Sequence, residues 1–310
     1  MRTSRIITSS IIALPLFAGT LAAGCGSDDS GDGGRGAGKV AVVATTMQLQ
    51  DFARQVGGER VDVTGVLGPD DEPHEYEPTP ANADAISGAD VVVENGANLD
   101  EWLEDLLANA GGEATRVTAS EGIDLLPTEE EGFPGDPHVW HDPDAAKKMV
   151  DNVAAGLAEA DPDGRAGYER NAEAYKREID EMAEQIRAEF DAIPAAQRKL
   201  VTTHDAFGYF GRAYDIDIVG TVLPSVTTET ETSGRQLREL IDTIEREGVK
   251  VIFTEQGVDP KLERQVAEEA GAEVETGLYA DTLGPEGSGA EEFIDAELAN
   301  AEAMAGAFSR

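Results

Sequence analysis

Short apolar runs alternate with amphipathic segments along the chain from about residue 40 onward. Val40–Thr45 is a nearly continuous apolar run, which indicates a buried parallel strand. Met47–Val56 carries apolar residues at helical spacing and stops at Gly57-Gly58, which predicts a helix. The pattern predicts further strands at Val61–Leu67, Asp90–Glu94, Arg116–Ala119, Leu200–Thr203, Ile216–Val222, Lys250–Thr254 and Glu273–Glu275. It predicts further helices at Pro80–Ser87, Leu99–Asn109, Phe207–Tyr214, Gly234–Glu247, Pro260–Ala270 and Glu291–Phe308.

The longest periodic segment runs from Asp163 to Ala192, and a helix that starts at Asp142-Pro143 precedes it. Its apolar residues recur at intervals of three and four, as on one face of a helix: Tyr168, Ala172, Tyr175, Ile179, Met182, Ile186 and Phe190. About thirty residues at ~1.5 Å each make a rod of roughly 45 Å. Because strands and helices alternate on both sides of this rod, we expect an α/β fold of two lobes with parallel sheets flanked by helices. The expected boundaries are 39–162, 163–193 for the linking long helix, and 194–310.

The first 24 residues have the features of a signal peptide. Arg2 and Arg5 precede the apolar run Ile6–Leu21, and small residues follow it. The run is too short and too polar for a spanning helix of about 20 apolar residues. Residues 25–38 are mostly Gly, Ser and Asp, which predicts a flexible tether.

Cys25 directly follows the small residues Ala22-Ala23-Gly24 and is the single cysteine of the chain. This arrangement resembles a lipobox, in which the cysteine becomes the lipid attachment site, although Ala22 stands where a leucine is usual. Ordinary signal cleavage beside a free Cys25 is the alternative. We expect an extracytoplasmic protein that is lipid-anchored to the cell membrane, or periplasmic. A single cysteine excludes an intrachain disulfide.

The composition is strongly acidic, with 62 Asp plus Glu against 24 Lys plus Arg and a net charge of −38. Nucleic acid is excluded as a partner, because phosphate binding requires a basic surface. The acidic excess would concentrate cations near the protein, but a plain solvated surface has the same composition. The charge therefore excludes partners without selecting one.

The chain holds four histidines, His74, His138, His141 and His204, each beside a proline or an acidic residue. The loops of His74, His138 and His204 lie between expected strands and helices, and open parallel sheets bind ligands beyond the carboxyl ends of their strands. Neutral imidazole, completed by a carboxylate, is a favoured ligand of zinc and other late divalent metals. From the pattern alone, a shared metal site and ordinary loop histidines both remain open.

Four segments resemble, in order, the ligand loops of the zinc and manganese solute-binding proteins of ABC importers (cluster A-I, the ZnuA/TroA-like family). They are Pro73-His74-Glu75-Tyr76-Glu77-Pro78, Asp136-Pro137-His138-Val139-Trp140 with Asp142-Pro143, Thr203-His204-Asp205-Ala206-Phe207-Gly208-Tyr209-Phe210, and Tyr279-Ala280-Asp281-Thr282-Leu283-Gly284. The resemblance covers roughly residues 40–308. It implies two lobes bridged by a rigid helix, with a metal in the cleft between them. His74 and His138 would come from the first lobe, and His204 and Asp281 from the second.

The resemblance implies a non-enzymatic, high-affinity zinc-binding protein that delivers its metal to the permease of an ABC-type importer. We expect it to act as a monomer. Three histidines and one carboxylate favour Zn²⁺ over Mn²⁺, because oxygen ligands suit harder ions. A manganese-specific binding protein of the same family is the alternative. Zinc members often carry a long His-rich acidic loop, whereas Glu129-Glu130-Glu131 brings no histidine.

Three further residues near these motifs have open roles. His141 stands where many relatives have an apolar residue, and it is either a second-shell or loading ligand or a plain loop residue. Glu255 ends an expected strand and is either a second-shell residue or a solvated carboxylate. Trp140 is expected to serve packing.

Two other classes of function compete with metal delivery. A zinc hydrolase would keep three protein ligands and an open water position, and Asp281 as a fourth ligand argues against it. A surface adhesin is the second alternative, since members of the family have been described in that role.

Overall fold

The structure, a computed structural model, describes residues 38–230 and 232–310. The predicted signal peptide, the predicted lipid attachment site at Cys25 and almost all of the predicted tether therefore lie outside the described residues. The described residues fall in one compact unit, Gly36–Arg310. Within the described part of the chain, no helix has both the length and the apolar character that crossing a membrane requires.

The first lobe is built on a parallel sheet with strand order β2-β1-β3-β4. Its strands are rich in Val and Thr, β-branched residues that pack well on a pleated surface. Val42 of β1 lies in register with Val63 of β2 on one side and with Val91 of β3 on the other. The elements are β1 (Val40–Ala44), α1 (Met47–Gly57), β2 (Val61–Gly65), α2 (Pro80–Ser87), β3 (Val91–Glu94), α3 (Trp102–Ala110), β4 (Thr115–Thr118) and α4 (Pro143–Ala160).

The second lobe repeats this layering. Strands β5 and β6 pair in parallel, as do β7 and β8, and β5 lies against β7, so the four strands sit side by side. A capping box of Ser233 and Gln236 fixes the start of α7. The elements are β5 (Lys199–Thr202), α6 (Gly208–Tyr214), β6 (Asp217–Thr221), α7 (Gly234–Glu247), β7 (Val251–Glu255), α8 (Lys261–Ala270), β8 (Glu273–Leu278) and α9 (Phe293–Phe308).

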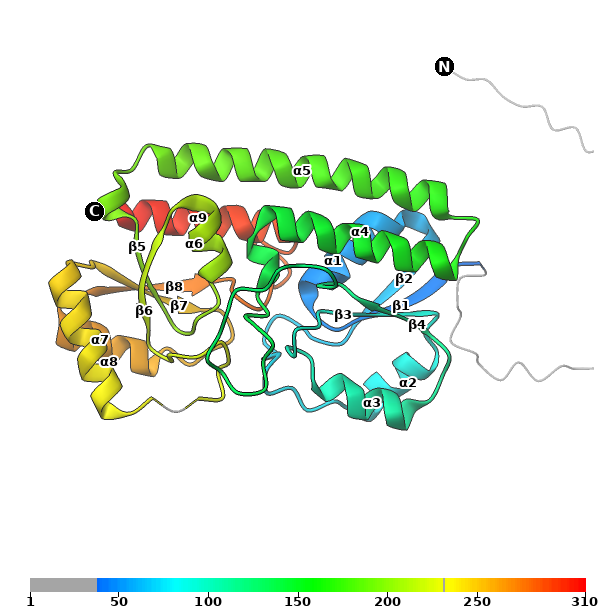
Figure 1. Cartoon of the computed structure of the whole chain (residues 1–310), viewed down its shortest axis with the longest axis horizontal. Coiled ribbons are helices and arrows are strands. Elements are labelled where there is room, and N and C mark those ends of the chain that lie inside the picture. Colours follow the sequence, from blue (N-terminus) through cyan, green and yellow to red (C-terminus); the bar gives the residue numbers. More distant parts are fainter. Residues whose placement is uncertain (1–37, 231) are drawn as a thin grey trace, which may run out of the picture. The chain divides into compact units, whose positions relative to one another are not determined.

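Helix α5 (Arg165–Asp191) runs along both lobes, with α9 beside it (Figure 1). Near its middle, Tyr175 donates a hydrogen bond to Asp51 of α1 in the first lobe. At its C-terminal end, Phe190 contacts Phe210 and Phe308 in the second lobe. The long helix therefore joins the lobes through packing near its middle and at its C-terminal end.

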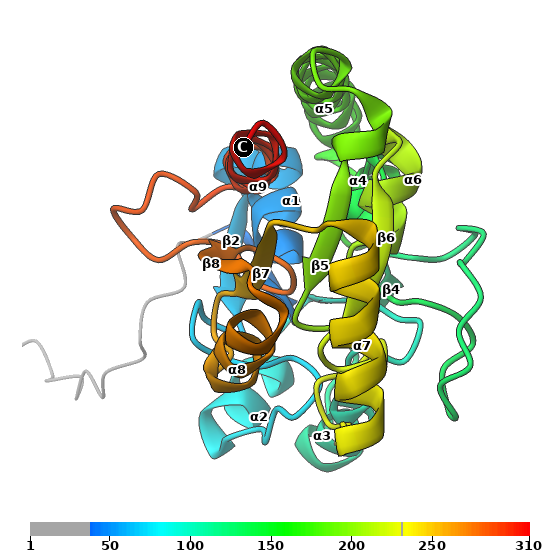
Figure 2. The ribbon, with the colours of Figure 1, turned by 90° about the vertical axis from the view of Figure 1, so that its left-hand side faces the viewer.

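Helices cover both faces of the sheets in both lobes. Helices α1, α4, α5 and α9 lie on one side, and α2, α3, α7 and α8 on the other (Figure 2). The larger hydrophobic core lies on the α5 side and contains buried residues of both lobes, while each lobe has a smaller core on its outer face. A shared core of this kind stabilises one relative position of the two lobes.

Each strand and helix expected from the pattern has a counterpart in the described residues. The expected α/β fold of two lobes with parallel sheets and one long helix is confirmed, whereas the exact lobe boundaries stay a prediction. Two elements, α3 and β8, have an observed start or end that differs clearly from the expected one. Helix α3 begins at Trp102 instead of Leu99. The backbone N–H groups of Leu103 and Glu104 bond three residues back, so the segment before Trp102 forms turns and not an α-helix. Strand β8 continues to Leu278, three residues past the expected end.

Candidate metal centre

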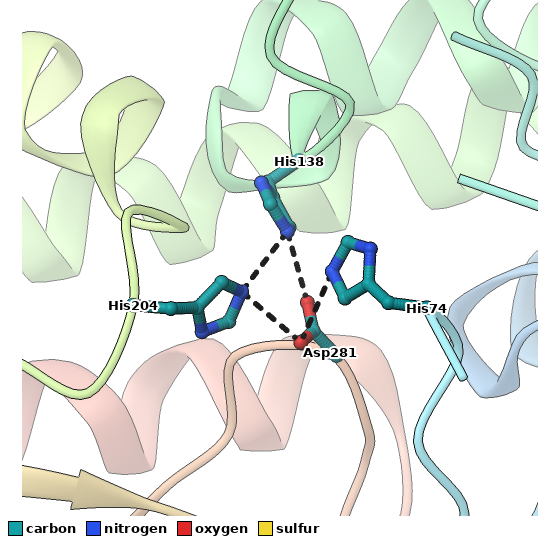
Figure 3. A group of neighbouring side chains, drawn as sticks. All are labelled: His74, His138, His204 and Asp281. Carbon is teal, nitrogen blue, oxygen red and sulfur yellow. Dashed lines mark hydrogen bonds and ion pairs between the residues drawn. The ribbon is translucent and has the colours of Figure 1, made fainter. Parts of the chain in front are cut away.

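Four side chains from four separate segments converge on one point: His74, His138, His204 and Asp281 (Figure 3). His74 lies in the loop between β2 and α2, and His138 directly precedes the short 3₁₀ turn before α4. His204 follows β5, and Asp281 follows β8. Each residue offers one ligand atom, and these atoms all lie within 4.8 Å of one another. The chain therefore brings together all four residues that the sequence singled out as a shared ligand set.

Three of the four residues form a tight triangle, in which Asp281 faces each histidine with a different carboxylate oxygen. The Nε2 atoms of His138 and His204 are 3.3 Å apart. Asp281 Oδ1 lies 3.2 Å from His138 Nε2, and Asp281 Oδ2 lies 3.3 Å from His204 Nε2. A tetrahedral ion with ligand bonds of about 2.0 Å separates its ligand atoms by about 3.3 Å. The triangle therefore has the spacing that a small four-coordinate cation requires.

The imidazole of His138 is held from behind by Asp136. One carboxylate oxygen, Oδ1, accepts the backbone N–H of His138 at 2.9 Å and lies 2.7 Å from its Nδ1. A proton held on Nδ1 by this contact leaves Nε2 as the free electron-pair donor. Asp136 therefore fixes both the orientation and the tautomer of His138.

Glu255 does the same for His204. Its Oε1 accepts the backbone N–H of His204 at 3.1 Å, and its Oε2 lies 2.5 Å from His204 Nδ1. Glu255 ends β7, so the neighbouring strand supplies the support for the loop that follows β5. The sequence had left Glu255 open between a second-shell residue and a solvated carboxylate. It is buried and contacts the histidine directly, so it is not a solvated carboxylate.

His74 differs from the other two histidines. Its side chain is 2 % exposed, yet neither ring nitrogen has a hydrogen-bond partner in the part of the chain that the structure describes. Its Nε2 lies 3.8 Å from Asp281 Oδ2, farther than the edges of the triangle. Burial lowers the pKa of His74 to about 3, so the ring is neutral at physiological pH. A buried imidazole without a partner is costly, which suits a group that completes its bonding with a ligand.

The charges in the centre are strongly coupled. Burial alone would raise the pKa of Asp281, but the charges of His204 and His138 outweigh it and hold this pKa well below its usual range. Burial opposes a charge on His138 and His204, but Asp281 with Asp136 raises the pKa of His138 to about 10. Glu255 with Asp281 raises the pKa of His204 to about 9. The centre thus holds positive charge on His138 and His204, and a metal cation would replace those protons.

Glu72 is a carboxylate near the centre that the sequence did not single out. Its Oε1 accepts the backbone N–H of His74 at 3.1 Å. Burial and the nearby Asp281 raise the pKa of Glu72 to about 7. Asp136 was also missed, although it stands two residues before His138 in a quoted motif, a spacing at which an aspartate often bonds the backbone ahead of it.

His141 lies outside the four-residue cluster. Its side chain is fully buried, its Nδ1 lies 2.8 Å from Glu297 Oε1 on α9, and its ring stacks on Phe207 at 4.7 Å. It is therefore neither a plain loop residue on the surface nor a neighbour of the converging atoms. Trp140 is buried, as its expected packing role requires.

A cavity of about 630 Å³ opens beside His74. Five of its lining residues are exposed carboxylates: Glu75, Glu77, Glu101, Asp105 and Glu229. No lysine or arginine of the described chain lines it. The approach to the four-residue cluster is therefore negatively charged.

Comparison with known proteins identifies the class of protein that this fold and site define. The family model described as zinc-uptake complex component A, periplasmic, matches residues 42–307. The chain belongs to this family, whose members are metal-binding substrate-binding proteins of ABC importers and not enzymes.

Individual relatives carry the names of three different metals. The chain is 36% identical over 291 residues to the manganese-binding lipoprotein MntA of Halalkalibacterium halodurans, covering 94% of this chain and 95% of that protein. It is 33% identical over 250 residues to the iron-binding protein YfeA of Yersinia pestis, covering 80% of this chain and 79% of that protein. The periplasmic zinc-binding protein TroA from Treponema pallidum superposes with a TM-score of 0.82 at 27% identity, covering 88% of this chain and all of that structure.

Proposed function

We propose that this protein captures a divalent transition metal with His74, His138, His204 and Asp281 and delivers it to the permease of an ABC importer. The single observation that carries the proposal is the convergence of three imidazoles and one carboxylate within 4.8 Å. Burying three imidazoles and a carboxylate costs free energy, and apolar side chains would pack the same space at a lower cost. A role in packing therefore does not account for the cluster.

The donor set supports zinc as the cargo. Three nitrogen ligands and one carboxylate suit zinc and other late divalent metals, whereas manganese prefers sites richer in oxygen. The triangle of 3.2 and 3.3 Å also fits a four-coordinate ion. Manganese is the second candidate, because the MntA relative, 36% identical, is named for manganese.

The location follows from the N-terminal segment and from the relatives. The MntA relative is named a lipoprotein, and Cys25 stands in a lipobox-like sequence of this chain. We propose that acyl chains on Cys25 hold the protein at the outer face of a membrane, with residues 25–38 as a tether. The folded unit would then meet its permease as a monomer.

Calorimetric titration of the metal-free chain with Zn²⁺, Mn²⁺ and Cu²⁺ tests the proposal. We expect one equivalent of metal to bind, with zinc tighter than manganese. Asp281→Ala removes the carboxylate that contacts two histidines, and we expect this variant to lose most of the affinity. The matched control is Asp259→Ala, which removes an exposed carboxylate on the loop before α8 and leaves binding unchanged.

Three outcomes separate the alternatives. Tighter binding of manganese than of zinc replaces the proposed cargo by the second candidate. Full zinc affinity in Asp281→Ala together with a gain or loss of hydrolytic activity overturns the proposal in favour of a zinc hydrolase. Absence of binding for every metal overturns metal delivery altogether.

A further inference from the structure

The chain has two tryptophans, Trp102 and Trp140, and both make the same contact. Trp102 Nε1 donates a hydrogen bond of 3.1 Å to the carbonyl oxygen of Pro73. Trp140 Nε1 donates a hydrogen bond of 3.1 Å to the carbonyl oxygen of Ala280. Pro73 directly precedes His74, and Ala280 directly precedes Asp281. Each indole N–H is therefore bonded to the peptide unit next to one residue of the four-residue cluster.

In the part of the chain that the structure describes, the loops that carry His74 and Asp281 lack the kind of buried carboxylate that holds the rings of His138 and His204. The rings of His138 and His204 are fixed by Asp136 and Glu255 through their Nδ1 atoms. Within the described residues, neither nitrogen of the His74 ring has a hydrogen-bond partner, and the carboxylate of Asp281 pairs with the histidines of the cluster. Asn300 of α9 holds the backbone of Tyr279, two residues before Asp281. Within the described chain, the indole bonds are made closer still, at the peptide units directly before His74 and Asp281.

The turn that carries Trp140 is itself anchored to the second lobe. Trp140 and His141 lie in the 3₁₀ turn that follows His138. His141 is bonded to Glu297 of α9 and stacks on Phe207, three residues after His204. The Trp140 bond therefore connects the His138 turn to the Asp281 loop. The stacking of His141 on Phe207 connects the same turn to the His204 loop.

Simple packing does not require the indole N–H groups. A phenylalanine would fill most of either volume, and a buried N–H has to be matched with an acceptor in good geometry. Trp102 is only half-buried and lines the acidic cavity beside His74, so its hydrogen bond is not forced by complete burial. Both tryptophans donate their indole N–H to the carbonyl directly before a cluster residue, and this repetition indicates a role at the cluster.

We infer that Trp102 and Trp140 are positioning residues that fix the placement of His74 and Asp281, and thereby the selectivity of the centre among divalent metals. The inference rests on the proposed function. A set of ligand atoms held near 3.3 Å spacing favours a small four-coordinate ion, and a looser set admits ions that take more ligands. Loss of an indole bond leaves the ligands in place but frees the backbone that carries one of them.

The test compares Trp140→Phe and Trp102→Phe with the wild-type chain. Each variant keeps an aromatic ring and removes only the N–H donor. Tyr175→Phe is the matched control, because it also removes one aromatic donor, here to Asp51, away from the cluster. For each protein we would record the visible absorption spectrum of the Co²⁺ form, the ratio of the zinc and manganese affinities, and the denaturant midpoint without metal.

We expect both tryptophan variants to bind metal with a zinc-to-manganese affinity ratio reduced by about tenfold, the lower end of the usual effect of lost outer-shell support. Their Co²⁺ spectra should change in intensity, because the absorption depends on coordination geometry. Tyr175→Phe should lower the denaturant midpoint and leave the ratio and the spectrum as in the wild type. If Trp140→Phe does not fold, Trp102→Phe in its half-buried position carries the test.

The inference is overturned if the tryptophan variants reproduce the wild-type spectrum and affinity ratio and lose only stability, as the control does. Failure of the wild-type chain to bind zinc, manganese or cobalt overturns the proposed function as well. The wild-type titration therefore separates the two failures before any variant is measured.

Discussion

The Nε2 atoms of His138 and His204 lie 3.3 Å apart, although the two histidines come from different lobes. Each ring is held from behind by a buried carboxylate, Asp136 or Glu255, at its Nδ1 atom. Neither ring can turn away without breaking that contact. The fold therefore holds the two Nε2 atoms against each other across the junction of the lobes, where a bound cation would replace the protons of the metal-free histidines.

The first prediction concerns the carboxylate behind His204. Glu255 faces both the backbone N–H and the Nδ1 atom of His204, whereas Glu255→Gln has one acceptor oxygen for the two groups and carries no charge. We expect zinc affinity to fall by about 10- to 100-fold. Competition with a chromogenic chelator measures the change.

Glu273→Gln, on the adjacent strand β8, is the control for this substitution. Glu273 is exposed and pairs with Arg310, so the same chemical change leaves zinc affinity unaltered. Equal affinities of the wild type and Glu255→Gln would show that the Nδ1 contact does not tune the ligand.

The second prediction separates the stability of the chain from its binding of metal. His74 is buried and, among the described residues, its ring nitrogens have no hydrogen-bond partner, so His74→Leu removes an unsatisfied polar group at similar volume. We expect the metal-free variant to be more stable by about 1 kcal/mol, the lower end of the cost of such a group. The stabilisation that zinc confers on the wild type should largely disappear, which thermal unfolding with and without zinc measures.

His141→Leu provides the contrast to His74→Leu. The same substitution leaves the buried carboxylate of Glu297 without its partner, so it should destabilise the chain. A loss of stability in His74→Leu as large as that in His141→Leu would contradict the assignment of His74 as an unsupported group.

The third prediction is a pH dependence that comes from Asp100. This buried carboxylate accepts hydrogen bonds from Thr45, Asn95 and Gly96, and burial raises its pKa to about 6. The folded state therefore holds the proton more tightly than the unfolded state, whose aspartate pKa is about 3.9. The contribution of Asp100 to stability is present below about pH 4 and is lost as the pH rises through about 6, with a total of up to about 3 kcal/mol.

Asp100→Asn tests this sign, because the amide does not titrate. We would measure the free energy of unfolding of both proteins from pH 4 to pH 7. The wild-type value minus the variant value should fall with rising pH across this window. A difference that rises with pH would mean that Asp100 is stabilised as the carboxylate by its hydrogen bonds.

The sequence pattern was sufficient for most of the fold because local signals agreed with the tertiary structure. Valine-rich runs such as Val91–Glu94 are buried on both faces of a parallel sheet, and the stripe from Tyr168 to Phe190 faces the core. The start of α3 was misplaced because the segment before Trp102 forms turns, and the positive φ angles of Ala97 and Asn98 in that segment are not marked by glycine.

The candidate centre was predictable as a set of residues but not as a geometry. The motifs around His74, His138, His204 and Asp281 are readable in the chain, and the structure brings these side chains together. The buried carboxylates that contact His204 and His141 were harder to predict. Glu255 is 51 residues from His204, and Glu297 is 156 residues from His141. Contacts over such separations depend on how the lobes pack, and a single sequence carries no local signal for them.

The last prediction concerns the acidic cavity beside His74. Its exposed carboxylates include Glu101 and Glu229, from the two lobes, and no basic residue of the described chain lines it. A cleft of one charge raises the local concentration of the opposite ion and speeds association, and salt screens the effect. In the double variant Glu101→Gln/Glu229→Gln we expect the association rate of zinc to fall roughly two- to fivefold at low ionic strength.

The dissociation rate should stay unchanged in this double variant, because neither carboxylate belongs to the four-residue cluster. Stopped-flow kinetics at low and high salt measure both rates, and the difference in association should vanish at high salt. Glu268→Gln/Glu269→Gln on α8 makes the same change of charge at exposed positions outside the cavity. We expect no slowing in this control, because only carboxylates that line the approach act at the distance where screening is incomplete. An equal slowing would assign the effect to the net charge of −38 rather than to the cavity.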